Sequence, residues 1–476
     1  MTESLTPDIC VIGAGSGGLS VAAGAAAFGV PVVLVEKGRM GGDCLNTGCV
    51  PSKALLAAAK RAHAIAHAQP FGLDARPAEI DFAQVHRHVH EVIAAIAPND
   101  SVARFTGLGV RVVAGTARFR DPDTVTVGDA FEIKARRFVI ATGSSPAVPP
   151  IPGLESTHYL TNESIFDLTA RPEHLIIIGA GPIGLELAQA FCRLGTRVTV
   201  LEAARPLARE DPECAAILLE VLKAEGIDIR AGASVVRVET ASPGIRVVVR
   251  AGGDTEEAID GSHLLVATGR RVDVGDLGLD RAGIAHDRKG VRVDRRLRTT
   301  NRRVYAVGDA AGGLQFTHVA NYHAGIVLRN VLFRLPATVS EAAVPRVTYT
   351  DPELAQVGLT EDEAKQRGER IQVLRWPYDE NDRAQAERET TGNIKVVTTD
   401  RGRILGATIL GPAAGETITT WTLAIGQKLN IRALAGIIIP YPTLSEVGKR
   451  AAITYFMPRL RSTWLRRIVV WLRRFG

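Results

Sequence analysis

Apolar runs separated by glycine-rich turns occur twice along the chain. Residues 9–12 and 32–35 are short and wholly apolar, with an alanine-rich segment between them. Residues 175–178 and 198–201 repeat the arrangement around a second helical segment. Short unbroken apolar runs are typical of strands that are buried on both faces of a parallel sheet. The pattern therefore predicts two strand–helix–strand modules.

Three further apolar runs extend these modules. Residues 138–143 and 264–269 both end in Ala-Thr-Gly, and residues 304–310 end in Gly308-Asp309-Ala310. We expect each run to be a buried strand that ends beside a ligand. An acid at a strand end, before small residues and a helix, is suited to holding a hydroxyl group.

The pattern changes after about residue 340, where apolar and polar residues alternate in three segments. Segments 347–352, 392–398 and 404–410 predict an antiparallel sheet with flanking helices. The stiff segment 146–153 (PAVPPIPG) marks an earlier boundary. We predict an α/β fold of the three-layer ββα type, with two Rossmann-like domains and an α+β domain. The expected boundaries are 1–150, 151–270, 271–340, 341–458 and a tail, 459–476.

Charge is concentrated at one end of the chain. Among 476 residues there are 57 Lys and Arg against 51 Asp and Glu, and six of the Arg lie within 459–476. The rest of the chain is therefore neutral, which argues against a nucleic-acid-binding body. The sequence shows no signal-peptide pattern and no apolar run of 18 residues, so we expect a cytoplasmic protein.

The tail itself predicts an amphipathic helix. On a helical projection five of its Arg fall on one side, Arg461 is out of place, and Trp464, Leu465, Ile468, Trp471, Leu472 and Phe475 fill the other. Such a helix is typical of peripheral contact with anionic lipid, here at the inner face of the membrane. A helix packed on a protein dimer with Arg outward is the alternative.

Both modules carry a GxGxxG turn and a terminal glutamate. The glycines are Gly13, Gly15 and Gly18 in the first module, and Gly179, Gly181 and Gly184 in the second. Glu36 and Glu202 each follow the first glycine by 23 residues. In this context the glycines bring a pyrophosphate onto a helix N-terminus and the acid accepts ribose hydroxyls, so we expect two dinucleotide sites. Glu202 favours NADH over NADPH, although Arg205 and Arg209 follow closely.

Two of the five cysteines form a motif. Cys44 and Cys49 lie in Gly41-Gly-Asp-Cys-Leu-Asn-Thr-Gly-Cys-Val-Pro-Ser-Lys53, where Pro51 suggests a helix start. Thiols near a helix N-terminus have lowered pKa values and are suited to disulfide exchange. We expect Cys10, Cys192 and Cys214 to be core residues. No second cysteine pair could complete a metal site, and His86, His88 and His90 are expected on a solvated helix face.

These motifs, in this order, resemble the class I FAD-dependent pyridine nucleotide–disulfide oxidoreductases, which include dihydrolipoamide dehydrogenase, glutathione reductase and mercuric reductase. The resemblance implies that FAD binds the first module and NAD(P)H the second. It implies a homodimer in which residues 439–446 complete the partner's site.

The resemblance also implies roles for individual residues. Cys49 would be the thiolate against the flavin, Cys44 the sulfur that attacks the substrate, and Lys53 would pair with Glu186 near the flavin. The implied FAD contacts are Gly13, Gly15, Gly18, Glu36, Gly42, Lys53, Thr142, Gly143, Asp309 and Ala310. The implied NAD(P) contacts are Gly179, Gly181, Gly184, Glu202 and Gly269.

The chain departs from the family at its acid–base residue. Most members carry His-x-His-Pro-Thr-x-x-Glu, whereas this chain has Tyr441 at the catalytic His position and keeps Glu446. Tyr is a poor base at neutral pH. Mercuric reductases resemble the chain here, but they end in a vicinal cysteine pair, and no cysteine follows Cys214.

We therefore expect a mercuric-reductase-like core that reduces a lipoyl, thiol-linked or other small acceptor. Three alternatives stay open. They are a dihydrolipoamide dehydrogenase, a membrane-surface NADH:quinone-type flavoprotein, and a flavin-binding scaffold or sensor without useful turnover.

Overall fold

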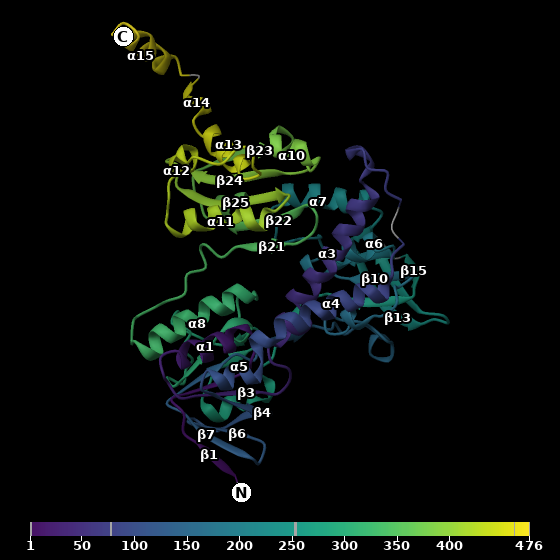
Figure 1. Ribbon diagram of the computed structural model, residues 1–476, viewed down its shortest axis with the longest axis vertical. Coiled ribbons are helices and arrows are strands. Elements are labelled where there is room, and N and C mark those ends of the chain that lie inside the picture. The colour runs from purple at the N-terminus through teal and green to yellow at the C-terminus, as the bar shows by residue number, and fades with distance from the viewer. Residues whose placement is uncertain (1, 77–78, 252–254, 461, 476) are drawn as a thin grey trace. The chain divides into compact units, whose positions relative to one another are not determined.

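The computed structural model describes residues 2–76, 79–251, 255–460 and 462–475 (Figure 1). It divides the chain into two compact units. The first contains residues 1–179, 194–196 and 235–339, and the second contains residues 180–193, 197–234 and 340–476. Each unit is described by itself.

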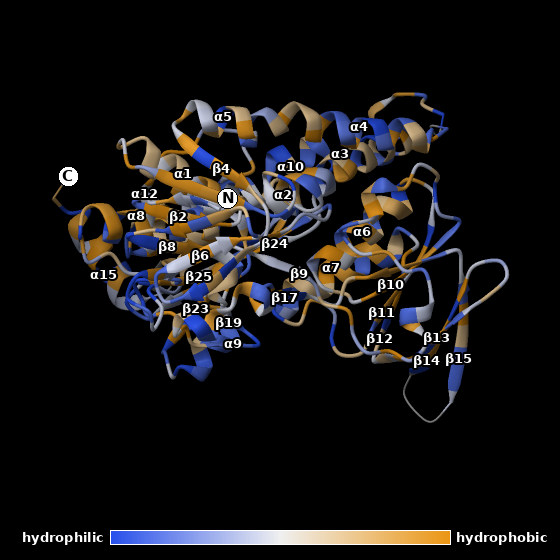
Figure 2. Ribbon diagram, turned by 90° about the horizontal axis from the view of Figure 1, so that it is seen from below, coloured by the Kyte–Doolittle hydropathy of each residue, from blue (hydrophilic) through white to orange (hydrophobic). Residues whose placement is uncertain are grey.

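A five-stranded parallel sheet forms the centre of the first unit. Its order is β20 (Val304–Ala306), β8 (Arg137–Ile140), β2 (Ile9–Ile12), β3 (Val32–Glu36) and β4 (Val110–Ala114). Ile9–Ile12 is buried at every position, as expected for a strand covered on both faces, and β2 has the colour of hydrophobic residues in Figure 2. The strands predicted at 9–12 and 32–36 are confirmed, and strands also lie within the predicted runs 138–143 and 304–310, where they end at Ile140 and Ala306.

Different layers cover the two faces of this sheet. On one face, Cys10, Ile12 and Phe138 pack against Phe119 and Ile133 of a smaller sheet. That sheet has the order β1 (Glu3–Leu5), β7 (Phe131–Lys134), β6 (Thr124–Val127) and β5 (Ala117–Asp121). The other face packs on helices α1 (Ser16–Ala26) and α8 (Thr317–Leu332). The expected three-layer ββα arrangement is confirmed for this unit.

Two helices follow the first dinucleotide module. Helix α3 (Cys49–Ala66) packs against α4 (Phe82–Ile96), whose N-cap Asp81 accepts a hydrogen bond from the Gln84 N–H. Short helices α2 (Gly42–Asn46) and α5 (Val102–Gly107) precede and follow this pair. Strands β9 (Ser144–Pro146) and β17 (Arg270–Val272) pair in an antiparallel manner.

The second dinucleotide module repeats the predicted order of elements. It contains β10 (His174–Ile178), α6 (Pro182–Arg193), β11 (Arg197–Glu202), α7 (Pro212–Ala224), β12 (Asp228–Ala231) and β16 (His263–Val266). Strand β10 pairs in parallel with β16, and β11 pairs in parallel with β12. An antiparallel pair, β14 (Ile245–Ala251) and β15 (Glu256–Gly261), lies in the first unit, and β13 (Ala233–Thr240) precedes it.

An antiparallel sheet dominates the second unit, as the alternating pattern predicted. Its order is β21 (Arg346–Thr348), β22 (Glu353–Gly358), β25 (Ile404–Gly411), β24 (Asn393–Thr399) and β23 (Ile371–Pro377). Tyr378, Trp421 and Tyr455 are buried in its core. The flanking helices are α9 (Glu361–Gln366), α10 (Asp382–Glu387), α11 (Ala414–Gly426), α12 (Ile431–Gly436) and α13 (Glu446–Thr454).

The tail differs from the single helix that the sequence predicted. It forms α14 (Met457–Leu460) and α15 (Thr463–Leu472), and Arg461 lies outside the described residues. Ser462 at the N-cap of α15 has extended φ and ψ angles, which end helical geometry there. Of the residues described, no helix is both long and apolar enough to cross a membrane.

Candidate active site

The two glycine-rich turns share one geometry. Gly13 has a φ of 105° and Gly179 a φ of 110°, and an added Cβ would lie 2.4 Å and 2.5 Å from a carbonyl oxygen of the neighbouring Ala-Thr-Gly segment. Only glycine fits both constraints. At Gly15 and Gly181, by contrast, a Cβ would meet no atom closer than 4.0 Å. This open space before a helix N-terminus fits a pyrophosphate.

Glu36 and Glu202 are held in matching ways. Each carboxylate accepts a hydrogen bond from the backbone N–H of the residue after the first glycine, at 2.5 Å for Glu36 and 2.9 Å for Glu202. Each carboxylate also accepts a hydrogen bond from the backbone N–H two positions later in the chain, at 2.7 Å for Glu36 and 2.9 Å for Glu202. A carboxylate has further lone pairs, so both side chains are fixed and keep acceptor capacity for ribose hydroxyls.

Asp309 lies where the sequence placed it, in a turn directly after β20. Its Oδ2 accepts a 2.5 Å hydrogen bond from the Ser144 hydroxyl and lies 3.9 Å from the Arg270 guanidinium. Burial raises the pKa of Asp309, and the Ser144 hydrogen bond and the Arg270 charge oppose this shift. A half-buried carboxylate at this sheet edge fits a cofactor hydroxyl.

The smaller residues implied for FAD line the same region of the first unit. The Thr142 hydroxyl donates to the Asp273 carbonyl at 2.7 Å, so the side chain is already engaged. Gly143 has a φ of 71°, and Ala310 is fully buried. A Cβ on Gly42 would lie only 2.7 Å from the Gly15 Cα, so the segment with the cysteines packs on the first glycine-rich turn. Their contacts with FAD stay predictions.

The two motif cysteines lie in consecutive helices. Cys44 is in α2, and Cys49 is the first residue of α3, two residues before the start that Pro51 suggested. Both are free thiols, Cys44 half-buried and Cys49 exposed. The Cys49 Sγ lies 3.4 Å from the Thr317 hydroxyl, at the start of α8.

The two thiols divide the proton unequally. The hydrogen bond with Cys44 lowers the pKa of Cys49 to about 6, with further help from Thr317 and the positive charge of Lys53, while burial opposes the shift. The same hydrogen bond and burial raise the pKa of Cys44. At neutral pH the reduced pair is therefore a Cys49 thiolate beside a protonated Cys44. The other cysteines differ, since burial raises the pKa of Cys10 to about 12.

Lys53 and Glu186, the expected ion pair, belong to different compact units. Lys53 lies one helical turn after Cys49 on α3. Glu186 is buried in α6, where one carboxylate oxygen accepts a 2.9 Å hydrogen bond from the Tyr349 N–H. Their pairing stays a prediction.

A shallow cavity of about 420 Å³ begins at Cys49. It is lined by Cys49, Val50, Lys53, Ala54 and Ala57 of α3 and by His88, Val92 and Ile96 of α4. The thiol, the ammonium group and the imidazole are its only polar side chains among these residues. Within the described parts of the chain, no group of three or more His, Cys, Asp and Glu could hold a metal ion.

Tyr441 is arranged as a hydrogen-bond donor. Its side chain is 70% exposed, and its hydroxyl donates to Asp382 at 2.6 Å. This hydrogen bond raises the pKa of Tyr441, so even less of the phenolate that could act as a base is present at neutral pH. Glu446, at the start of α13, pairs with Arg450 at 3.0 Å. Both lie in the second unit, so their place opposite the cysteines stays a prediction.

Several polar residues around the cysteines were not singled out from the sequence. They are Asp43, Ser144, Asn162, Arg270 and Thr317. Asp43 directly precedes Cys44 and Arg270 directly follows Ala-Thr-Gly, so their position next to a motif was an available signal. Asn162 and Thr317 gave no such signal.

Two nucleotide-type turns, a thiol pair with opposed pKa shifts and a separate antiparallel domain define the class of flavin-dependent disulfide reductases. The pyridine nucleotide-disulphide oxidoreductase family matches residues 7–324, and its dimerisation domain matches residues 344–452. The chain belongs to this family.

Named relatives agree with this assignment. The chain is 37% identical over 455 residues to mercuric reductase from Streptomyces lividans, covering 94% of this chain and 96% of the relative. It is 36% identical over 456 residues to dihydrolipoyl dehydrogenase from Geobacillus stearothermophilus, again covering 94% and 96%.

Solved structures have the same fold. The HOCl-induced flavoprotein disulfide reductase RclA from Escherichia coli superposes with a TM-score of 0.83 at 30% identity, covering 94% of this chain and 99% of that one. LpdA from Mycobacterium tuberculosis gives 0.86 at 27% identity, covering 96% and 100%. The protein is thus an FAD-dependent oxidoreductase that uses a pyridine nucleotide and acts on sulfur groups. Its dimerisation domain supports a homodimer.

Proposed function

We propose that the protein oxidises NADH and passes the electrons through the Cys44–Cys49 pair to a lipoyl, thiol-linked or other small acceptor. The observation that carries this proposal is the pair of Cys44 in α2 and Cys49 at the first position of α3, whose pKa values are shifted in opposite directions. FAD, when bound, would supply the transfer of two electrons from the nicotinamide to the disulfide. Reduction of that S–S bond takes two electrons and one proton, leaving a Cys44 thiol and a Cys49 thiolate.

Cys44 would then react with the acceptor. The Cys49 thiolate accepts a hydrogen bond from Cys44, so it can take the Cys44 proton. Cys49 would thus replace the family histidine, whose position Tyr441 occupies. The Cys44 sulfur attacks the acceptor disulfide, whose S–S bond breaks, and the leaving acceptor thiolate takes the proton from Cys49. The restored Cys49 thiolate then attacks Cys44, which breaks the mixed disulfide, and the second acceptor sulfur leaves as a thiolate that takes a proton from water. Tyr441 donates its single O–H to Asp382 and has a raised pKa, so it is not suited to remove a proton from Cys44.

NADH is the nucleotide that the second site favours. The Glu202 carboxylate is held by two backbone N–H groups at 2.9 Å, so it cannot swing away from a 2′-phosphate. Arg205 donates to the Ala208 carbonyl at 2.8 Å, and Arg346 donates to the Arg209 carbonyl at 2.7 Å. Both contacts stabilise the loop that contains Arg205 and Arg209.

The acceptor is tested by comparing NADH oxidation with lipoamide, glutathione disulfide, Hg(II) and a soluble quinone. We expect Cys44→Ser to abolish the rate with every true acceptor, since NADH would still reduce the flavin but no sulfur could attack. A rate unchanged by Cys44→Ser would contradict the proposal and favour the alternative of direct transfer from the flavin. Cys192→Ser, at a thiol that donates to the Glu225 carbonyl, is the matched control.

We also propose that α15 makes the peripheral membrane contact. Trp464, Trp471 and Phe475 are 68%, 55% and 71% exposed, and four arginines of residues 466–474 lie among them. No acid occurs in this segment. Exposed Trp and Phe beside Arg are complementary to the interface of an anionic bilayer, where the rings enter the headgroup region.

A further inference from the structure

A carboxylate directly precedes the segment that joins the two redox cysteines. Asp43 Oδ1 accepts hydrogen bonds from the Thr47 hydroxyl at 2.9 Å and from Asn162 Nδ2 at 3.0 Å. The same Asn162 nitrogen donates to the Thr47 carbonyl at 3.1 Å. Asp43 and Asn162 together therefore fix both ends of the segment between Cys44 and Cys49.

The remaining oxygen of Asp43 faces a cation. Asp43 Oδ2 lies 3.3 Å from Arg270 Nη2, and the Arg270 side chain is only 14% exposed. The two residues are 227 positions apart in the chain, but both belong to the first compact unit. A half-buried arginine beside a carboxylate is weakly screened by salt, so the pair acts on nearby charges.

Arg270 also lies close to Asp309, the carboxylate that is expected to bind the flavin cofactor. Its Nε donates to the Ser144 hydroxyl and its Nη2 to the Ser144 carbonyl, both at 2.7 Å. The Ser144 hydroxyl donates in turn to Asp309 at 2.5 Å, and Arg270 Nε lies 3.9 Å from the same carboxylate. The Arg270 guanidinium thus lies beside two carboxylates, Asp43 and Asp309.

The charges in this cluster do not cancel. Asp43 and Asp309 carry two negative charges when ionised, against the single positive charge of Arg270. Asp273 adds a further negative charge on the Asp309 side, and Lys53 a positive charge on the Cys49 side. The excess negative charge affects the pKa values of both Asp309 and Cys49. Asp43 contributes to raising the pKa of Asp309, and it also opposes the lowering of the pKa of Cys49. Reduction of the disulfide adds a further negative charge, because it takes up two electrons and one proton.

We infer that Arg270 is a positioning residue that joins Asp43 of the redox segment and Asp309 of the flavin side into one charge-coupled cluster, so that the thiolate formed at Cys49 and the occupation of the flavin site influence each other. The inference rests on the proposed roles of Cys49 and Asp309. Asp43 disfavours the thiolate, and Arg270 compensates for Asp43.

The cluster predicts opposite effects for two substitutions. Asp43→Asn removes a negative charge near Cys49, so it favours the thiolate. Arg270→Gln leaves two carboxylates without a counter-ion, so it disfavours the thiolate. A residue that only supports the loop would not give shifts of opposite sign.

The test is the pH dependence of Cys49 alkylation by iodoacetamide in reduced full-length protein, with the modified peptide identified by mass spectrometry. We expect the midpoint to fall by about half a pH unit in Asp43→Asn and to rise by a similar amount in Arg270→Gln. The exposed Asp129→Asn is the control and should leave the midpoint unchanged. The measurement is made with FAD bound and after its removal, and Arg270→Gln should reduce the difference between these two midpoints.

Shifts in the same direction, or none, in folded variants would overturn the inference. If circular dichroism shows that Arg270→Gln does not fold, Arg270→Lys is the variant that keeps the positive charge. The direction of the midpoint shift in Asp43→Asn then decides the test by itself. A wild-type Cys49 that reacts only near the ordinary thiol pKa would instead contradict the proposed function. The two failures are therefore distinguishable.

Discussion

At the scale of single residues, the second dinucleotide site shows how geometry adds to residue type. Glu202 was expected from its distance to Gly179, and the structure adds the two backbone donors that fix its carboxylate. A fixed anion discriminates more strongly than a mobile one, because it cannot move away from a second negative charge.

Nucleotide preference tests this point directly. We expect kcat/KM for NADH to exceed that for NADPH by at least tenfold, and Glu202→Ala to reduce the ratio by about tenfold, chiefly by improving use of NADPH. Glu220→Ala, at a surface glutamate of α7 that pairs with Lys223, is the control. An unchanged ratio in Glu202→Ala would show that Glu202 does not set the preference.

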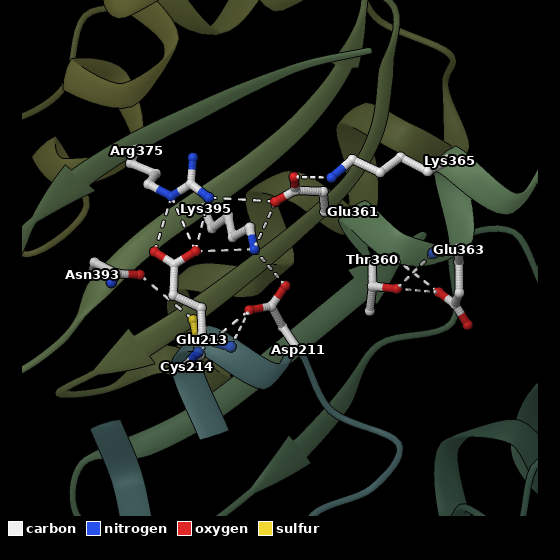
Figure 3. Close-up of polar contacts among 10 residues, drawn as sticks. All are labelled: Asp211, Glu213, Cys214, Thr360, Glu361, Glu363, Lys365, Arg375, Asn393 and Lys395. Atoms are coloured by element: carbon white, nitrogen blue, oxygen red, sulfur yellow. Dashed lines mark hydrogen bonds and ion pairs between the residues drawn. The ribbon is translucent and has the colours of Figure 1, made fainter. Parts of the chain in front are cut away.

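At the scale of elements, a buried charge network ties a helix of the second module to the C-terminal sheet (Figure 3). Lys395 of β24 lies 2.9 Å from Asp211, 3.1 Å from Glu213 and 3.0 Å from Glu361, and its side chain is only 4% exposed. Asp211 also caps α7 by accepting from the Glu213 and Cys214 N–H groups. Arg375 of β23 completes the network with Glu213 at 2.8 Å and Glu361 at 3.3 Å.

Removal of the central cation should be costly. Lys395→Met leaves the fully buried Asp211 without its partner, and we expect it to lower the free energy of unfolding by about 3–5 kcal/mol. Lys365→Met removes a more exposed cation that pairs with the same Glu361 at 2.6 Å, and should cost about 0–1 kcal/mol. Urea denaturation of the two variants checks this difference, and equal losses would contradict it.

The same network predicts a response to acid. Hydrogen bonds from Lys365 and Lys395 lower the pKa of Glu361 from 4.5 to about 2. The folded-state pKa is depressed, so this stabilisation is fully present above pH 4.5 and is lost as the pH falls towards 2. Wild-type stability should therefore decline across this window more steeply than that of Lys395→Met.

At the scale of the whole molecule, the net positive charge lies in the tail and not in the nucleotide modules or the C-terminal sheet. The formal charge of +6 equals the number of arginines within 459–476, so the two nucleotide modules and the C-terminal sheet together are neutral. A neutral enzyme body with a cationic, aromatic tail suggests that the tail determines where the protein is held rather than what it catalyses.

Vesicle co-sedimentation of the full chain tests the role of the tail. We expect binding to phosphatidylglycerol vesicles but not to phosphatidylcholine vesicles, since arginines near an anionic surface contribute about 1 kcal/mol each. Arg466→Gln with Arg467→Gln should weaken binding roughly tenfold or more, and Trp464→Ser with Trp471→Ser should weaken it as well.

Leu73→Ser, at a side chain of similar exposure outside the tail (60%), is the control for loss of apolar surface. Equal binding by all the variants would exclude the tail as the membrane contact. A change in dimer mass with no change in vesicle binding would favour the alternative of packing on the dimer.

Local sequence by itself determined the two dinucleotide modules, the thiol pair and the antiparallel domain. The reason is that turns, strand burial and the spacing from Gly13 to Glu36 depend on residues close together in the chain. It could not decide that α3 begins at Cys49, or that the tail is divided into α14 and α15, because helix ends depend on a few tenths of a kcal/mol per residue.

Only the tertiary structure brought Thr317 to Cys49, Arg270 to Asp43 and Ser144 to Asp309, across separations of 268, 227 and 165 residues. Such contacts depend on how strands β8 and β20 and helix α8 pack around the parallel sheet, and no local pattern encodes them. The sequence thus determines that a thiol pair and two nucleotide sites exist, while the packing decides which charges surround the thiolate, because electrostatic interactions depend on distance in space and burial.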